Sequence, residues 1–272
     1  MRTAYQGEPG AYSEAAALEL HPDTELMPCS SFEAVFDAVE RGTASHGVLP
    51  LENTIGGSIH RNFDLLVEHD LPIVGEVEVS VDHCLLVYPG TTRDAIRRVY
   101  SHPQGLAQCE QFLKRLAGVE LVATYDTAGS AKLVRDGALR DTAAIASRRA
   151  AELFELEILE AGIQDYAINL TRFAVIARQP DPNAEADKTT IVFALPNEPG
   201  ALYRALGVFA ERQIDLTKLE SRPIRGRAWE YMFYADLGMA RNELRCARAL
   251  VHLAEFAKWV RTLGSYPRWA AR

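Results

Sequence analysis

The sequence predicts an α/β protein with a larger N-terminal part and a smaller C-terminal part. Over residues 1–178, short apolar stretches of strand length alternate with helical stretches, which is typical of a parallel sheet covered by helices. Residues 179–188 are polar and contain two prolines, which indicates a linker. Residues 189–268 follow the order βαββαβ, which is the ferredoxin-like motif.

In the first half of the larger part, strands are expected at residues 2–6, 25–29 and 46–51, and helices at residues 12–21, 32–41 and 58–69. Ser30 or Ser31 can cap the second of these helices, because a hydroxyl oxygen placed there accepts from free N–H groups. An extended stretch, residues 73–87, then leads from this lobe into a second one.

The second lobe repeats the pattern, with strands expected at residues 99–101, 119–124 and 143–146 and helices at residues 104–116, 127–135 and 148–154. A last strand, residues 171–178, is expected to return to the first lobe. Two crossing strands would then join two lobes around a cleft, as in folds like the periplasmic binding proteins. In the C-terminal part, strands are expected at residues 189–194, 216–222, 229–236 and 259–263, and helices at residues 200–212 and 243–256.

Composition limits the class of function. Apolar residues make up 48% of the chain and charged residues 24%, as in ordinary soluble proteins, and the formal charge of −8 argues against a nucleic-acid partner. We find no apolar stretch of a signal peptide or membrane span, so we expect a cytoplasmic protein with no membrane partner. The four cysteines form no CxxC motif, and no residues have metal-ligand spacing. We therefore expect no metal and no other cofactor, with His60, His83 and His102 structural or on the surface.

Four polar segments lie where expected strands end and helices begin. They are residues 7–13, 52–58, 101–104 and 126–130. Ligands of open α/β sheets bind at these strand ends, and the N–H groups of a helix start favour anions. Each segment alone is equally explained as a cap or a turn, whereas four segments meeting in one cleft would indicate a ligand site.

Two of the candidate segments carry groups suited to catalysis. A carboxylate and an amide at Glu52 and Asn53 could orient a substrate and serve proton transfer, or Asn53 could simply cap the next helix. Thr171 could donate a hydrogen bond and Arg172 could pair with a carboxylate, or both could be an ordinary strand start. In the C-terminal part, residues 197–202 and 220–223 could hold an amino acid, or could be a capped helix and an edge strand.

Five short segments, in order along the chain, resemble the prephenate dehydratase family with a C-terminal ACT regulatory domain. They are Ala4-Tyr5-Gln6-Gly7-Glu8-Pro9-Gly10-Ala11-Tyr12-Ser13, Leu49-Pro50-Leu51-Glu52-Asn53-Thr54, Ser101-His102-Pro103-Gln104, Asn169-Leu170-Thr171-Arg172-Phe173 and Glu220-Ser221-Arg222-Pro223. Each segment is weak alone, but five with consistent spacing over nearly the whole chain are specific.

The resemblance implies loss of CO2 and water from prephenate to give phenylpyruvate, on the way to phenylalanine. It places the hydrogen-bond donor or relay for the leaving hydroxyl at Thr171. The other active-site positions that it implies are Glu52, Asn53, Ser101 and Gln108, with Arg172 and Phe173 at the substrate. It also implies an L-phenylalanine effector and a homodimer or homotetramer. The effector residues would be Asn197, Gly200, Ala201, Leu202, Glu220, Ser221, Arg222 and Pro223.

The substrate itself stays open at this point. Residues 57–62, 104–108, 143–147 and 230–234 also look close to plant-type arogenate dehydratases, and arogenate carries an alanyl group where prephenate carries a pyruvyl group. We expect prephenate first, with arogenate dehydratase or a dual-specificity cyclohexadienyl dehydratase as the alternative. A non-catalytic amino-acid-binding sensor, or a two-lobed enzyme with a different anionic substrate, is the alternative from another class.

Overall fold

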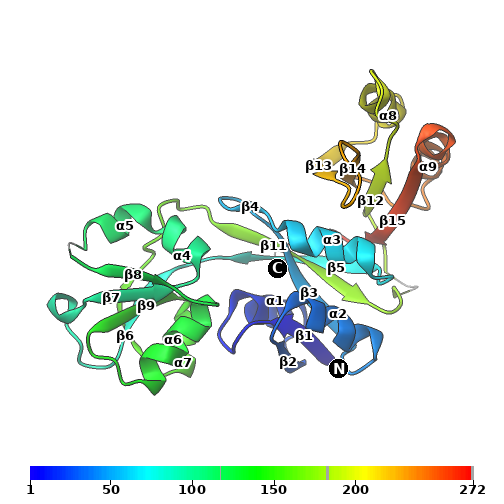
Figure 1. Cartoon of the computed structure of the whole chain (residues 1–272). Helices are drawn as coiled ribbons and strands as arrows, with labels where there is room; N and C mark the ends of the chain where they lie inside the picture. The colour runs from blue at the N-terminus through cyan, green and yellow to red at the C-terminus, as the bar shows by residue number, and fades with distance from the viewer. Residues whose placement is uncertain (117, 182–183, 271–272) are drawn as a thin grey trace. The chain divides into compact units, whose positions relative to one another are not determined.

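The structure is a computed structural model that describes residues 1–116, 118–181 and 184–270 (Figure 1). The chain forms two compact units. The first unit contains Met1–Leu65 and Val77–Val175, and the second contains Leu66–Glu76 and the chain from Ile176 onward. Strands β5 (Ile73–Ser80) and β11 (Leu170–Ala177) each belong partly to one unit and partly to the other. Each unit is described by itself below.

The first lobe of the first unit is a mainly parallel sheet. Strands β1 (Arg2–Gln6), β2 (Glu25–Cys29) and β3 (His46–Asn53) pair in parallel, and the strand order is β2-β1-β3-β11-β5 with β4 (Gly57–Ser58) beside β3. Helices α1 (Tyr12–Leu20) and α2 (Phe32–Glu40) pack on β1 and β3, and α3 (His60–Glu68) follows β4. The Ser31 side chain accepts from Ala34 N at 3.2 Å, so the expected cap of α2 is confirmed.

The second lobe of the first unit has its own sheet, ordered β10-β6-β9-β7-β8. Its strands are β6 (Cys84–Val87), β7 (Arg98–Ser101), β8 (Glu120–Ala123), β9 (Thr142–Ala146) and β10 (Glu157–Ala161). Its helices are η1 (Arg93–Ala95), α4 (Pro103–Gln108), α5 (Glu110–Lys114), α6 (Thr127–Asp136) and α7 (Arg148–Leu153).

Alternation along the central strands of this lobe builds two cores, because successive side chains of a strand point to opposite faces. Cys84 and Leu86 of β6 lie in a core with alanines of α6 and α7. Leu85 and Val87 lie in the other core, with Phe112 of α5. Both faces of the sheet are therefore covered, which explains why β6 and residues 143–146 of β9 are apolar.

Three details of the first unit differ from the expectation. The stretch expected as one strand, residues 73–87, is two strands with a break at residues 81–83. The helix expected at residues 104–116 is interrupted at Cys109, where Asp165 N donates to Gln108 O at 2.7 Å and the Asp165 side chain accepts from Gln111 N. Strand β10 was not expected, because glutamates interrupt its apolar pattern.

The second unit has the order β12 (Lys188–Ala194), α8 (Ala201–Ala210), β13 (Leu216–Pro223), β14 (Tyr231–Leu237), α9 (Leu244–Phe256) and β15 (Trp259–Tyr266). Its strands pair in the order β13-β14-β12-β15, all antiparallel, which confirms the ferredoxin-like motif (Figure 1). Alternate residues of β12, Ile191 and Phe193, pack against Phe209 of α8 and Leu253 of α9. One face of the sheet is thus covered by both helices.

A buried charged cluster lies at the start of β12. Lys188 Nζ is 2.7 Å from Glu76 Oε2 and 3.2 Å from Asp236 Oδ2, and all three side chains are buried. Thr190 donates to Asp236 Oδ1 at 2.7 Å and contacts the Tyr266 hydroxyl at 2.6 Å. Residues 182 and 183 of the expected linker lie outside the described residues, while Lys188, also expected in the linker, is part of the sheet.

Candidate active site

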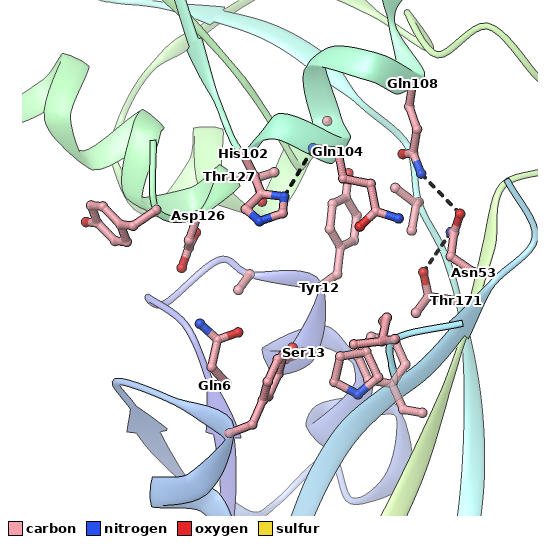
Figure 2. A pocket seen from close by; sticks show the side chains of 18 of the residues that line it. Gln6, Tyr12, Ser13, Asn53, His102, Gln104, Gln108, Asp126, Thr127 and Thr171 are labelled. Atoms are coloured by element: carbon pink, nitrogen blue, oxygen red, sulfur yellow. Dashed lines mark hydrogen bonds between the residues drawn. The ribbon is translucent and has the colours of Figure 1, made fainter. Parts of the chain in front are cut away.

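A cavity of about 530 Å³ lies within the first unit and is lined by both of its lobes (Figure 2). Each of the four polar segments singled out in the sequence contributes side chains to its wall. They are Ala11, Tyr12 and Ser13 from the first segment, Asn53 from the second, His102 and Gln104 from the third, and Asp126 and Thr127 from the fourth. The convergence that would indicate a ligand site is therefore present.

Three buried amides form a closed ring of hydrogen bonds beside the cavity. Gln108 Nε2 donates to Asn53 Oδ1 at 3.1 Å, Asn53 Nδ2 donates to Asn169 Oδ1 at 2.7 Å, and Asn169 Nδ2 donates to Gln108 Oε1 at 3.1 Å. Each amide thus donates to the next, and the side chains come from α4, β3 and the residue before β11.

Backbone groups set the direction of this ring. The N–H groups of Ile55 and Gly56 donate to Asn53 Oδ1 at 3.0 and 2.7 Å, so that atom must be the acceptor oxygen. Asn53 Nδ2 therefore faces Thr171 Oγ1, 3.0 Å away, and donates to it (Figure 2). Because the Thr171 oxygen accepts this bond, its own proton is directed to another acceptor, and Thr171 lines the cavity.

His83 extends the ring on its far side. Its Nε2 is 2.9 Å from Gln108 Oε1, and that oxygen accepts, so Nε2 carries the proton. Burial lowers the pKa of His83, which keeps the imidazole neutral at neutral pH. Its Nδ1 faces the Tyr12 hydroxyl at 3.2 Å, and burial raises the pKa of Tyr12 well above its usual value.

Several residues in or beside the cavity wall were given no catalytic or binding role from the sequence. His83 was expected to be structural or on the surface, yet it is buried and lines the cavity, as does His102. Asn169 belongs to the motif of Thr171 but was given no role. Ring closure depends on contacts that span 116 residues, from Asn53 to Asn169, which no local spacing signals.

The other expected active-site residues lie behind the cavity wall or on it. Phe173 lines the cavity and is buried. Ser101 is fully buried, outside the lining set, and donates to Ile145 O at 2.8 Å. Arg172 Nη2 donates to Glu52 Oε2 at 3.1 Å, and neither side chain is among the lining residues.

Charge in the cavity wall is unusual for a site that would take an anion. The lining residues that the structure describes include two carboxylates, Glu33 and Asp126, but no lysine or arginine. The starts of α1, α2 and α6 do reach the wall, and free N–H groups at helix starts stabilise anions. Backbone groups, not cationic side chains, are thus the partners available to a carboxylate here.

Within the described residues, no group of three or more His, Cys, Asp or Glu side chains is arranged to hold a metal ion. None of the helices found in the described ranges is long and apolar enough to cross a membrane.

The residues expected at the effector site lie in two segments of the second unit. Asn197 and Gly200 precede α8, and Gly200 has a φ of 82°, a left-handed conformation that favours glycine. Ala201 and Leu202 form the first turn of α8 and pack on the core of the unit. The other four, Glu220, Ser221, Arg222 and Pro223, end β13 and pair with β14.

The two-lobed α/β unit with its polar cavity and the attached βαββαβ unit define the class of a ligand-binding catalytic domain with a regulatory domain. Comparison with protein families makes this specific: the prephenate dehydratase model matches residues 3–181, and the ACT domain model matches residues 189–245. The chain belongs to the prephenate dehydratase family and carries an ACT domain.

Several relatives of the chain are plant enzymes. The chain is 50% identical to arogenate dehydratase/prephenate dehydratase 6, chloroplastic, of Arabidopsis thaliana, over 98% of this chain and 69% of the relative. It is 49% identical to arogenate dehydratase 1 of Petunia hybrida, over 98% of this chain and 67% of the relative.

Solved structures share the whole fold. Prephenate dehydratase from Arthrobacter aurescens, in complex with L-Phe, is 30% identical with a TM-score of 0.88, covering 98% of this chain and 90% of that chain. A protein described as GqqA, a novel type of quorum quenching acylase, is 38% identical with a TM-score of 0.88, covering 99% of this chain and 98% of that chain.

Proposed function

We propose that the chain is a prephenate dehydratase, which converts prephenate to phenylpyruvate in phenylalanine biosynthesis. The observation that supports this best is the Thr171 hydroxyl, which accepts from Asn53 and lines the cavity. In this reaction the bond to the ring carboxylate breaks and releases CO2. The electron pair enters the ring, and the C4–O bond breaks so that hydroxide leaves.

The chemistry demands little beyond positioning and one donor. Aromatisation of the ring supplies the driving force, and negative charge develops on the departing oxygen. A hydrogen bond aimed at that oxygen stabilises the transition state more than the ground state. We assign this donor to Thr171, acting as a donor or relay because a threonine hydroxyl is a very weak acid.

The remaining expected residues act around this donor. Asn53 and Gln108 hold Thr171 in its donating orientation, and Phe173 forms an apolar wall against the ring. Three residues behind the wall, Glu52, Ser101 and Arg172, support these groups. The substrate carboxylates bind the N–H groups at the starts of α1 and α6.

Arogenate is the second candidate substrate. The plant relatives at 46–50% identity are named arogenate dehydratases, some with prephenate dehydratase in the name. Arogenate would lose the same two groups and give phenylalanine directly.

The acylase relative points to a further chemistry, amide hydrolysis, which needs an activated nucleophile. Thr171 accepts from an amide and not from a base, which favours dehydration over hydrolysis.

We further propose that L-phenylalanine is an effector that binds the ACT domain through Asn197, residues 200–202 and residues 220–223. The Arthrobacter relative, crystallised with L-Phe, supports this.

The proposed domains are residues 1–178 and 189–268, joined at 179–188, and the family matches at 3–181 and 189–245 support them. A cytoplasmic homodimer or homotetramer completes the proposal, although several plant relatives are named chloroplastic.

The test is direct. Purified protein is incubated with prephenate and, separately, with arogenate, and phenylpyruvate and phenylalanine are quantified by chromatography. Product from prephenate supports the proposal, and product from arogenate alone selects the second candidate. If neither substrate yields an aromatic product while a known dehydratase in parallel does, the proposed function is wrong and the sensor alternative gains support.

A further inference from the structure

Glu33 presents an ionised carboxylate to the cavity. It lies in the first turn of α2 and is one of the lining residues. Arg61 Nε donates to its Oε1 at 2.8 Å, and the Glu33 side chain is 48% exposed. Its own backbone N–H, followed by Arg61, lowers the pKa of this carboxyl, so Glu33 is anionic at neutral pH.

The other carboxylate of the wall is engaged in holding the fold. Asp126 Oδ1 accepts from Gly129 N at 2.9 Å and caps α6, while its Oδ2 accepts from Glu8 N at 2.9 Å. Asp126 is also buried, at 7% exposure. Glu33 also accepts hydrogen bonds within the protein, from its own backbone N–H, Arg61 and Ser31, but its side chain is 48% exposed, so it is the more accessible of the two lining carboxylates.

The two candidate substrates differ in the group that such a carboxylate would meet. Prephenate carries a ketone beside its side-chain carboxylate and is a dianion. Arogenate carries an ammonium group at the same carbon, and its net charge is smaller by one unit. A carboxylate attracts an ammonium donor and repels a dianion, and the described lining residues include no lysine or arginine to offset this repulsion.

We infer that Glu33, oriented by Arg61, faces the side-chain α-carbon of the substrate and raises activity with the amino acid relative to activity with the keto acid. This inference rests on the proposed dehydratase function and concerns the ratio of the two activities. Arg61 fixes the orientation of the carboxylate through the bond from its Nε to Oε1, while the Glu33 side chain stays 48% exposed.

The experiment compares Glu33→Gln with the unmodified protein, using kcat/KM for arogenate and for prephenate. Glutamine keeps the shape of the side chain and removes the charge. Loss of a hydrogen bond to a charged group corresponds to about a 10- to 100-fold change. We therefore expect kcat/KM for arogenate to fall by about tenfold or more, while kcat/KM for prephenate stays the same or rises.

Glu25→Gln is the matched control. Glu25 also belongs to the first unit and pairs with an arginine, Arg2, but it lies on the surface outside the lining set. The same change of charge there should leave the ratio of activities unchanged. Arg61→Gln should lower the ratio of kcat/KM for arogenate to kcat/KM for prephenate by a smaller factor than Glu33→Gln does, because the Glu33 carboxylate remains but loses its fixed orientation.

The outcomes separate the inference from the proposed function. A selective fall with arogenate in Glu33→Gln, absent in Glu25→Gln, supports the inference. An equal fall with both substrates, or a ratio unchanged within twofold, overturns it while leaving the dehydratase function intact. Failure of the unmodified protein to turn over either substrate would instead refute the dehydratase function, and the inference with it.

Discussion

Replacing Asn53 by aspartate changes one amide nitrogen into an oxygen and should reverse the hydrogen bond at Thr171. In the native arrangement Asn53 Nδ2 donates to Thr171 Oγ1 at 3.0 Å and to Asn169 Oδ1 at 2.7 Å. The introduced carboxylate offers only acceptors, so the Thr171 hydroxyl would donate to it. Thr171 could then no longer donate to the departing oxygen of the substrate.

The expected loss follows from what one donor contributes to a developing oxyanion. Removal of such a donor costs about 100- to 1000-fold in kcat. The bond acts mainly in the transition state, so kcat should fall more than KM rises. The measurement is steady-state dehydration by Asn53→Asp, with prephenate and arogenate, across a range of pH.

Asn169→Asp is the control for added charge. This variant introduces a carboxylate at a residue that contacts Asn53 and not Thr171. Asn53 Nδ2 can still donate to the new carboxylate, and only the hydrogen bond from residue 169 to Gln108 is lost. We expect a fall of less than tenfold for this variant. Protonation of the carboxyl in Asn53→Asp would restore a donor toward Thr171, so its relative activity should rise as pH falls. Equal losses in both variants, with no recovery at low pH, would refute the assigned direction of the ring.

Three further predictions concern stability and regulation. Lys188→Met should lower the free energy of unfolding in urea by about 3–5 kcal/mol, since it leaves the buried carboxylates of Glu76 and Asp236 without their cation; a loss below 1 kcal/mol would contradict this. Burial lowers the pKa of His83 in the folded state, so the unfolded state binds more protons below pH of about 6.5, and stability should decrease as pH falls below that value. His83→Asn should reduce this slope in pH-dependent unfolding, and an unchanged slope would show that His83 does not cause it. Phenylalanine should inhibit dehydration, and Glu220→Ala should weaken that inhibition in rate assays without changing the uninhibited rate; full inhibition of the variant would exclude Glu220 from the effector site.

Much of the fold follows from local patterns in the sequence. The alternation of apolar strands and helices predicted both lobes, and the βαββαβ order of the second unit is confirmed. The break at Cys109 was not predicted, because it depends on Asp165, which is distant in sequence. Strand β10 was missed for a related reason: it is a partner of β6 at the sheet edge, and its own residues alternate poorly.

Local patterns in the sequence also predicted part of the candidate site. Strand ends and helix starts indicated the four segments that line the cavity, and the motif of Thr171 indicated the residue that we propose as the donor. The sequence could not indicate which way that hydroxyl points, because its direction depends on backbone N–H groups of Ile55 and Gly56 acting through Asn53. Glu33 was overlooked because a glutamate in a first helical turn is usually explained by the helix dipole alone.

The buried lysine at the start of β12 is shared by two carboxylates, one from β5 and one from β14. One positive charge is paired with two negative charges, and the two carboxylates repel each other. This repulsion offsets part of the attraction of each carboxylate to the ammonium group. A fragment cut at residue 189 would retain Asp236 but lose both Lys188 and Glu76. Lys188, the last residue of the proposed linker, therefore belongs electrostatically with the sheet of the second unit, and Glu76 contributes to its surroundings although it precedes Lys188 by more than a hundred positions.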